Sequence, residues 1–547
     1  MRERIRKAVS KALTQAGTGE TMFTVEQPND LAYGDYATNA ALMAAKTFNK
    51  DPRKLADELA RNIKNFLGEA ERVEVAGPGF INITLSRDAI AFVIAEADAQ
   101  GPMWGKGSES VGQRVMVEYS NPNTFKEMHI GHLVGTIIGE SISRLVENGG
   151  AEIKRDTFGG DVGPNVAKAL WALRKAGITE IENAKQIGAA YVEGSRAYEE
   201  SPEAKTEIDE INKVIYMGVD TALMDLWRRG REVSMEEFRR IWRIVGSHFD
   251  YEFFDSDTTK SALRLVRDGL ARGIFKESDG AVIYDGKTKG VHTMVFITSH
   301  GTPTYEAKDI GLAFLREERW PSDRVIIITG NEQNGRFKTV FAALAELAPK
   351  IAAKTSHIGT GFLRLTSGKM SSRGGDIITA SDLIKEIVEK ASERNADPLI
   401  AEQVALGAIK YMILRQSPGS DITFDAKKSL SLEGDSGPYL QYALVRARKI
   451  LAYAGGEIGT DTPPAPYIIE RLMTHFPEVV ARAASELAPN VLITYLTELA
   501  SAWNSLYAAE QILGSSEEAY KQRVARAFVN TMTNGLALLG IPAPEKM

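Results

Sequence analysis

The segment from Arg114 to Gly150 constrains the fold more than any other part of the sequence. It begins with a strand-like run, RVMVEYS, continues with the polar loop NPNTFKEMHIGH, and ends in a helical pattern of apolar residues that stops at two glycines. A strand, a loop and a helix in this order form the first half of a βαβ unit. The segment therefore predicts a parallel sheet covered by helices, with a ligand at the edge where its strands end.

The patterns on either side of this segment divide the chain into further units. Residues 1–108 combine two amphipathic helices with alternating strands around Gly77-Pro78-Gly79, and a Gly- and Ser-rich linker closes this unit. From about residue 381 onward the pattern is almost entirely helical. The expected units are an α/β domain at 1–108, a parallel-sheet domain at 114–380 with a helical insertion at about 165–250 and later strands at 294–298 and 325–329, a helical connector at 381–430, and an all-helical domain at 431–547.

Composition excludes several classes of chemistry. The 547 residues contain no cysteine, so disulfides, thiolate nucleophiles and cysteine-bound zinc are impossible. The first residues are charged rather than apolar, and no stretch of the sequence has the apolar length of a membrane span. We therefore expect a cytoplasmic protein with no zinc and no membrane partner. The net charge of −6 decides nothing about nucleic acid, because such surfaces are local patches.

The loop after the expected strand ends in His129-Ile130-Gly131-His132, at the amino end of the expected helix. The two imidazoles are three residues apart and therefore share a helix face. Gly131 leaves room for an adenine ring against the backbone. The free N–H groups of a helix N-terminus attract phosphate, so we expect His129 and His132 to hydrogen-bond phosphate oxygens as charge develops on them. The alternative at this point is a coincidental pair or a metal site.

A second polar segment, Gly368–Gly375, places a cation and two hydroxyls between glycines. Its glycines would let the loop close over a triphosphate. We expect it to grip pyrophosphate, with a point charge from a lysine and hydrogen bonds from serines. The expected ATP-binding residues in this segment are Lys369, Met370, Ser371 and Ser372. The alternative is an ordinary polar surface turn.

In this order and this far apart, the two segments resemble the HIGH and KMSKS motifs of class I aminoacyl-tRNA synthetases. Other stretches resemble the arginyl-tRNA synthetase family specifically, and the resemblance covers nearly the whole chain. These stretches are YGDY at 33–36, AGPGFINI at 76–83, VEYSNPN at 117–123, Thr304-Tyr305 with Asp309, GNEQ at 330–333, PYLQYA at 438–443 and LGIP at 539–542.

The resemblance implies both fold and activity. The fold would be a Rossmann-like catalytic domain, an α/β N-terminal domain that contacts the tRNA elbow, and an all-α C-terminal domain that binds the anticodon. The activity would be arginine–tRNA ligation: ATP with Mg²⁺ activates L-arginine to arginyl-adenylate, and the arginyl group passes to the 3′ end of tRNA(Arg), releasing AMP and pyrophosphate. We expect a monomer.

The resemblance also assigns the amino-acid pocket. A guanidinium group is a planar fork of donors whose best partners are carboxylates. Tyr305 and Asp309 are four residues apart and would share a helix face. By resemblance they hold the guanidinium group with help from Glu118, whereas Asn123 and Gln333 hold the α-amino and carboxylate end. Most family members have Ser where Asn121 stands and Arg where Lys308 stands. This chain carries a lysine before the histidines, Lys126, as well as Lys369, and we expect both to be catalytic.

Aromatic and basic residues interleave on the expected helices of the last domain. Single-stranded RNA loops are held by stacking and positive charge. We expect Tyr442, Arg446 and Trp503 to lie near the anticodon. The alternative is that the aromatic residues belong to the core and the cations to a solvated face.

Three other functions fit parts of the sequence. The first is a class I synthetase for another amino acid. The cysteine enzyme commonly uses thiolate-bound zinc, which a chain without cysteine cannot supply. The glutamate enzyme would need cations around the substrate side chain in place of Asp309. A small nucleotidylyltransferase would not need the units at either end of the chain. A non-catalytic tRNA-binding paralogue would not need His129, His132 and Lys369, and an aminoacylation assay separates it from an enzyme.

Overall fold

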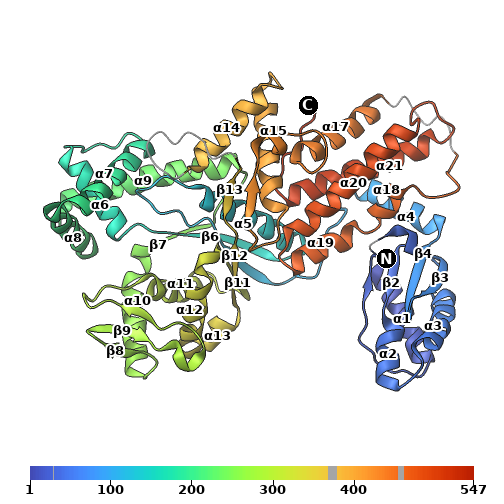
Figure 1. The fold of residues 1–547 in the computed structure, drawn as a ribbon, viewed down its shortest axis with the longest axis horizontal. Coiled ribbons are helices and arrows are strands. Elements are labelled where there is room, and N and C mark those ends of the chain that lie inside the picture. The colour runs from blue at the N-terminus through green and yellow to red at the C-terminus, as the bar shows by residue number, and fades with distance from the viewer. Residues whose placement is uncertain (29, 367–377, 454–460) are drawn as a thin grey trace.

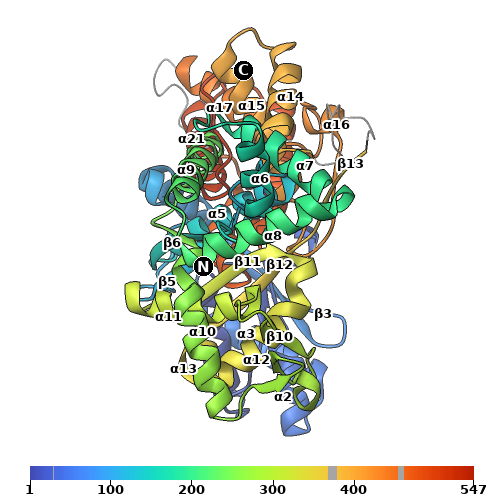
Figure 2. The ribbon, with the colours of Figure 1, turned by 90° about the vertical axis from the view of Figure 1, so that its left-hand side faces the viewer.

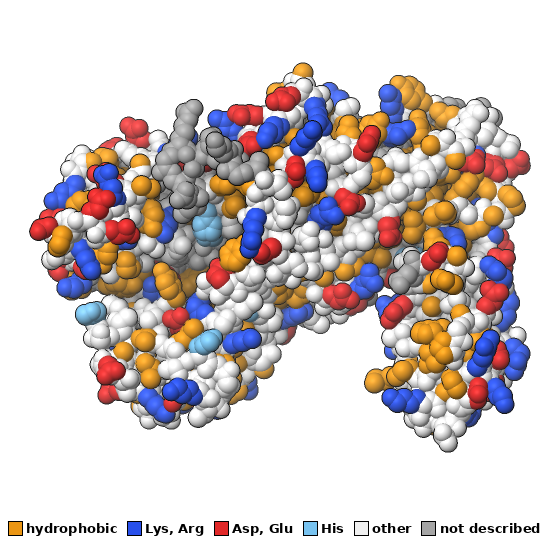
Figure 3. All heavy atoms as spheres, in the orientation of Figure 1, with side chains coloured by type: hydrophobic (Ala, Val, Ile, Leu, Met, Phe, Trp, Pro, Cys, Tyr) orange, Lys and Arg blue, Asp and Glu red, His pale blue; other side chains and the backbone are white. Residues whose placement is uncertain are grey.

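The computed structural model describes residues 1–28, 30–366, 378–453 and 461–547. Figure 1 shows an elongated molecule. The helical C-terminal part lies along one side, the middle part of the chain lies beside it, and the N-terminal domain is attached at the far end of the helices. Figure 3 shows an open notch between the N-terminal domain and the middle part, with basic and acidic side chains interspersed over this face.

A five-stranded sheet organises the middle part, and all its neighbouring strands are parallel, as the sequence predicts. Its order is β12 (Thr355–Thr360), β11 (Arg324–Gly330), β5 (Arg114–Glu118), β6 (Glu152–Gly159) and β7 (Tyr251–Phe254). The chain runs from β5 outward to β6 and β7, and later returns to the other side of β5 as β11 and β12. The strand order therefore reverses between β5 and β11, and ligands bind at such a point in open α/β sheets.

Helices cover this sheet on both sides. α5 (Ile130–Asn148) connects β5 to β6 and is buried over most of its length. The segment after β7 forms a compact unit of its own around Phe275, Phe296 and Leu344. Its elements are α10 (Asp255–Ala271), β8 (Lys276–Ser278), β9 (Ala281–Tyr284), η3 (Gly286–Lys289), β10 (Met294–Ile297), α11 (Tyr305–Arg319), η4 (Asn331–Gln333), α12 (Asn334–Leu347) and α13 (Pro349–Ala353). The strand expected at 294–298 exists as β10, but it pairs antiparallel with β9 in a separate three-stranded sheet.

The insertion between β6 and β7 is helical, as expected. It consists of α6 (Pro164–Lys175), α7 (Ala184–Glu200), α8 (Pro202–Met217) and α9 (Thr221–Ile244). Figures 1 and 2 show α6, α7 and α8 on one side of the parallel strands and α10 to α13 on the other. Phe125, from the loop after β5, is fully buried in the apolar core of the insertion with Leu170, Ile208 and Trp227. The insertion therefore anchors the loop that carries the histidines.

The N-terminal domain is an antiparallel sheet packed with helices. Its strand order is β1 (Val25–Glu26), β2 (Tyr36–Thr38), β4 (Phe80–Leu85) and β3 (Ala70–Ala76). Its helices are α1 (Arg2–Gln15), η1 (Leu31–Tyr33), α2 (Ala40–Phe48), α3 (Pro52–Phe66), α4 (Arg87–Gln100) and η2 (Gly101–Met103). Hydrogen bonds tie this domain to the C-terminal helices: Asp35 accepts from Arg471 at 2.7 Å, and Glu470 accepts from Arg87 at 3.1 Å.

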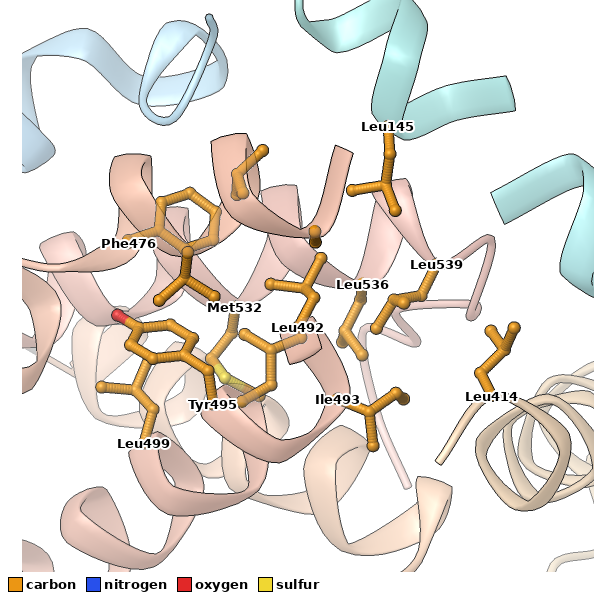
Figure 4. Close-up of a cluster of buried hydrophobic side chains, with 14 of the residues drawn as sticks. Leu145, Leu414, Phe476, Leu492, Ile493, Tyr495, Leu499, Met532, Leu536 and Leu539 are labelled. Atoms are coloured by element: carbon orange, nitrogen blue, oxygen red, sulfur yellow. The ribbon is translucent and has the colours of Figure 1, made fainter. Parts of the chain in front are cut away.

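The C-terminal part is helical and shares its core with the middle part. Its elements are α14 (Ala380–Ser392), α15 (Pro398–Leu414), α16 (Ala426–Ser429), α17 (Gly437–Tyr453), α18 (Ile468–Met473), α19 (Phe476–Ser485), α20 (Pro489–Ala509) and α21 (Glu518–Leu538). A short parallel pair, β13 (Leu363–Leu365) and β14 (Ile422–Phe424), interrupts the helices. Figure 4 shows Leu145 of α5 pointing toward Leu536 and Leu539 at the end of α21. None of the described helices is both long and apolar enough to span a membrane.

Candidate active site

The loop after β5 has an unusual backbone. Ser120, Asn121 and Phe125 all have positive φ angles, of 74°, 51° and 61°, which non-glycine residues rarely adopt. Hydrogen bonds hold this conformation: Asn121 donates from Nδ2 to Glu118 Oε1 at 2.6 Å and accepts from the Phe158 backbone N–H at 2.9 Å. Strain of this kind persists only where the surroundings impose it, and it concentrates at functional sites. The amide of Asn121 bridges two strands, a role that a shorter serine would not reproduce in the same way.

The two histidines lie together at the start of α5. Their rings are stacked with centroids 3.6 Å apart, and His129 Nδ1 accepts the Gly131 backbone N–H at 3.1 Å. A Cβ atom on Gly131 would fall 3.0 Å from the His129 ring, so glycine permits this close stack. Burial lowers the pKa of both histidines, and the nearby Lys126 charge lowers it further. Both rings are therefore neutral at pH 7, and each can donate one N–H to a phosphate oxygen.

Lys126 lies between the histidines and the insertion. Its charge lowers the pKa of both histidines, and its Nζ lies 4.2 Å from the centroid of the Tyr191 ring of α7. This cation–π contact fixes the position of the Lys126 ammonium group against the insertion. The insertion thus places Lys126 as well as the loop itself.

Lys369, Met370, Ser371 and Ser372 lie outside the described residues. The chain that follows them is anchored beside the histidines. The Ile130 backbone N–H donates to Ile378 at 3.2 Å, and the Ala380 N–H donates to Met128 at 2.7 Å. The segment expected to grip pyrophosphate is therefore followed by residues that pair with the loop expected to bind ATP.

A second group of polar side chains lies at the ends of α11 and β11. Asp309 of α11 forms an ion pair with Arg336 of α12, and Arg336 Nε donates to Gln333 Oε1 at 2.7 Å. Burial raises the pKa of Asp309 to about 6, although Arg336 acts in the opposite direction. Tyr305 begins α11 one turn earlier and is 53% exposed. The sequence placed Asp309 and Gln333 in one pocket but did not anticipate the arginine that contacts both.

Glu118 lies beside this pocket in a buried charge network. It forms an ion pair with Arg316, which is also paired with Asp156 at 2.5 Å, and all three side chains are almost fully buried. One Glu118 oxygen accepts from Arg316 and the other from Asn121. Each Glu118 oxygen thus has one donor here, and a carboxylate oxygen can accept a second, so the expected help of Glu118 with the guanidinium group stays a prediction. Arg316 is seven residues after Asp309, two turns along the same face of α11, and that spacing is the signal by which the sequence could have revealed it.

A small cavity of about 20 Å³ lies between polar and hydrophobic side chains of this site. Glu118 and Asp309 line it together with Phe337, among others. The Phe337 ring stacks on His357 at 4.2 Å, and His357 Nε2 lies 2.8 Å from Thr329 Oγ1. Burial lowers the pKa of His357 to about 4, so this ring is neutral. A cavity of this size admits one water molecule but not an amino acid.

The last residue expected at the amino-acid site, Asn123, lies near the carboxyl end of β6. The Asn123 side chain lies against Gly160, because a Cβ atom on this glycine would fall 2.2 Å from Asn123 Oδ1. Lys308 is buried and pairs with Asp255 of α10 at 2.9 Å, and it also lies 3.3 Å from the Tyr216 hydroxyl of α8. Lys308 therefore joins α11 to the insertion.

The structure corrects one of the three residues expected at the RNA surface. Trp503 is 0% exposed and stacks on Phe528 of α21, so it belongs to the helical core and cannot stack on a base. Arg446 does lie at the surface between two aromatic rings: its guanidinium carbon is 5.4 Å from the Tyr442 ring centroid and 4.0 Å from that of Tyr507. The surface aromatic residue of α20 is thus Tyr507, one turn after the predicted tryptophan.

Family models match almost the whole chain. The model described as "tRNA synthetases class I (R), catalytic domain" matches residues 100–426. The models described as "Arginyl tRNA synthetase N terminal domain" and "DALR anticodon binding domain" match residues 1–85 and 440–547. The first model alone covers more than half of the chain.

Individual proteins match over the same extent. The arginine–tRNA ligase of Treponema denticola is 32% identical and aligns with 96% of this chain and 94% of its own length. That of Lactobacillus delbrueckii subsp. bulgaricus is 30% identical, over 96% and 95% of the two chains. The solved structure of Thermus thermophilus arginyl-tRNA synthetase matches with a TM-score of 0.82 and 26% identity, and it covers 100% of both chains. The likeness thus extends over all three parts of the molecule.

Proposed function

Because the chain belongs to the arginyl-tRNA synthetase family and joins arginine to tRNA, we propose how its residues divide this work. The α5 N-terminus with His129 and His132 binds ATP, and Asp309 with Tyr305 binds the arginine side chain. Two observations support this division. The histidines follow β5 and Gln333 follows β11, on the two sides of the point where the strand order reverses.

The ATP half relies on neutral donors at a helix N-terminus. His129 and His132 each donate an N–H to phosphate oxygens, and the positive end of α5 adds its field. Lys126 and Lys369 supply point charges to the triphosphate, and Met370, Ser371 and Ser372 complete its binding. Mg²⁺ enters with ATP as part of the substrate and offsets its charge.

The reaction needs no protein nucleophile. The arginine carboxylate attacks the α-phosphorus in line, a bond forms between them, and the bond to pyrophosphate breaks. A terminal hydroxyl of tRNA then attacks the arginyl carbonyl carbon and AMP leaves. Positioning and charge stabilisation supply most of the acceleration.

The arginine half carries the specificity. Asp309 pairs with the guanidinium group and Tyr305 covers it, while Gln333 and Asn123 hold the α-amino and carboxylate groups. Glu118 orients Arg316 and keeps the local potential negative. The observation that carries this assignment is that Asp309 and Gln333 already hold a guanidinium group in the free protein, that of Arg336. Pairing through buried hydrogen bonds discriminates by roughly 10⁴ or more against residues that leave them unmade.

The proposed tRNA contacts lie in both the N-terminal and the C-terminal domain. The N-terminal domain contacts the tRNA elbow, and Tyr442, Arg446 and Tyr507 form the stacking surface near the anticodon. The units proposed are residues 1–108, 114–380, 381–430 and 431–547. The proposal includes a monomer in the cytoplasm, and light scattering on the purified protein tests the monomeric state directly.

The deciding experiment is arginine-dependent exchange of pyrophosphate into ATP, measured with and without tRNA. His129→Ala and Lys369→Ala should each lower the rate by about two orders of magnitude or more, as loss of a transition-state hydrogen bond does. His248→Ala, at an exposed histidine between α9 and β7, serves as the matched control and should keep the full rate. Full activity of both His129→Ala and Lys369→Ala would refute the ATP-site assignment.

A further inference from the structure

In the free protein, Arg336 contacts the two side chains that a bound arginine would contact. Its guanidinium group pairs with Asp309, and its Nε donates to Gln333 Oε1 at 2.7 Å. The two side chains that it contacts are the ones assigned above to the two ends of the substrate. The ion pair is mostly buried, with Arg336 19% and Asp309 12% exposed. A ligand guanidinium therefore cannot reach Asp309 in the same way while Arg336 stays.

Arg336 is held less firmly than the other arginine of the site. Arg316 is 4% exposed and lies between two carboxylates, Glu118 and Asp156. Arg336 is more exposed and lies in the first turn of α12, where the positive end of the helix disfavours a cation. Of the two, Arg336 is the side chain that can leave at the lower cost.

A second carboxylate is available to Arg336 once it leaves Asp309. Burial lowers the pKa of Arg336, but the charges of Asp309 and Glu306 raise it by more. Glu306 precedes Asp309 by three residues on α11 and thus lies on the same helix face. The arginine side chain can move from one acid to the other without losing an ionic partner.

We infer that Arg336 occupies the guanidinium site of the free enzyme and is displaced when substrate arginine binds. This inference rests on the proposed role of Asp309. Arg336 acts as an internal competitor, so the apparent Kd of arginine is the intrinsic Kd divided by the fraction of enzyme in which Arg336 has moved away. The same factor applies to every ligand that needs the site vacated, whatever its charge.

The test compares L-arginine with L-citrulline, which has a neutral ureido group of nearly the same shape. Calorimetric titration at pH 8 measures both Kd values for the wild type and for Arg336→Gln. We expect both Kd values to fall together, by about fivefold or more, because displacement is no longer required. Arg319→Gln removes an exposed arginine from the end of α11 and is the charge-matched control, with both Kd values unchanged.

The other outcomes overturn the inference in distinguishable ways. If the Kd of arginine falls but that of citrulline does not, Arg336 acts only through its electric field. If both stay the same or rise, Arg336 positions the pocket instead of blocking it. Asp309→Asn is measured beside these variants, and an unchanged arginine affinity there would refute the proposed pocket itself.

A second measurement needs no variant and covers the case in which Arg336→Gln does not fold. A crystal structure of the wild type soaked in L-arginine should show the substrate guanidinium on Asp309 and the Arg336 side chain turned away. An Arg336 still paired with Asp309 beside bound arginine would overturn the inference.

Discussion

Burial raises the pKa of Asp309 to about 6, so the charge of this side chain depends on pH within the range of ordinary assays. Above pH 6 the carboxylate is ionised and can pair with a guanidinium group; as the pH falls through 6 it takes up a proton and the pairing is lost. The Kd of arginine should therefore be flat above about pH 7 and rise toward tenfold per pH unit well below 6. Calorimetric titration from pH 5 to pH 8 measures this.

The control is Asp309→Asn, whose side chain does not titrate. Its affinity for arginine should be weak and nearly constant over the same interval. A wild-type profile that stays flat down to pH 5 would show that Asp309 is not the group that pairs with arginine.

At the residue scale, the sequence predicts positions more readily than contacts. His129 and Gln333 follow β5 and β11, so their placement at one edge follows from a parallel sheet. Asp309 lies in α11, which follows a strand of the antiparallel sheet, so its contact with the same site does not follow from that rule. The partners of the buried arginines do not follow, because a sequence does not say which acid an arginine meets. Trp503 and Tyr507 are four residues apart on a helix that is apolar around much of its circumference. Only the packing of α21 decides which of the two is buried.

The crossing of α15 and α17 gives a prediction at the scale of elements. A Cβ atom on Gly437 would fall 2.1 Å from the backbone oxygen of Gly407, and backbone cannot turn aside as a side chain can. Gly437→Ala should therefore destabilise the helical part by about 1–3 kcal/mol or more, as overpacking does. Thermal unfolding followed by circular dichroism measures the loss.

Gly68→Ala is the matched control, because a Cβ atom there meets nothing within 4 Å among the described residues. Its unfolding temperature should change little. Equal stability of the two variants would mean that the helices can separate at this crossing without cost.

At the scale of elements, the sequence pattern can predict a strand without predicting the sheet to which the strand belongs. The strand at Met294–Ile297 is correctly predicted as a strand, but it belongs to the antiparallel sheet beside α10. A short apolar run has the same periodicity in either sheet, so its partners cannot be read from it. The pair β13 and β14 was missed because each strand is only three residues long and lies among helices.

At the scale of the whole molecule, buried ion pairs fix the N-terminal domain to the C-terminal helices. Asp35 is fully buried, and its partner Arg471 is 19% exposed. Arg471→Met should leave this carboxylate buried without a cationic partner, at a cost of about 3–5 kcal/mol. We expect faster hydrogen exchange at the Leu85 amide, which donates to Asp35 at 2.7 Å.

A second pair across the same junction is the control. Arg526 and Asp98 also connect these two parts, but Arg526 is 44% exposed, and such pairs contribute about 0–1 kcal/mol. Arg526→Met should leave the exchange of Leu85 almost unchanged. Equal acceleration in both variants would show that burial of Asp35 does not control this junction.

The sequence predicts the three parts of the molecule but not this junction. Each part has its own periodicity, whereas the pairing of Asp35 with Arg471 depends on two surfaces that no local pattern describes. The shared core around Leu145 and Leu536 was missed for the same reason, since α5 reads as an ordinary helix of its own domain.

The pairing of Asp35 with Arg471 also has a consequence for biosynthesis. The aspartate precedes its partner by 436 residues, so at translation rates of about 5–20 residues per second the ribosome adds the arginine roughly 20–90 s later. During that interval the first domain has left the ribosome with a carboxylate prepared for a partner that has not yet been made. A nascent chain stalled before α18 should therefore expose a docking face that chaperones can recognise, and synthesis of the last helices closes it.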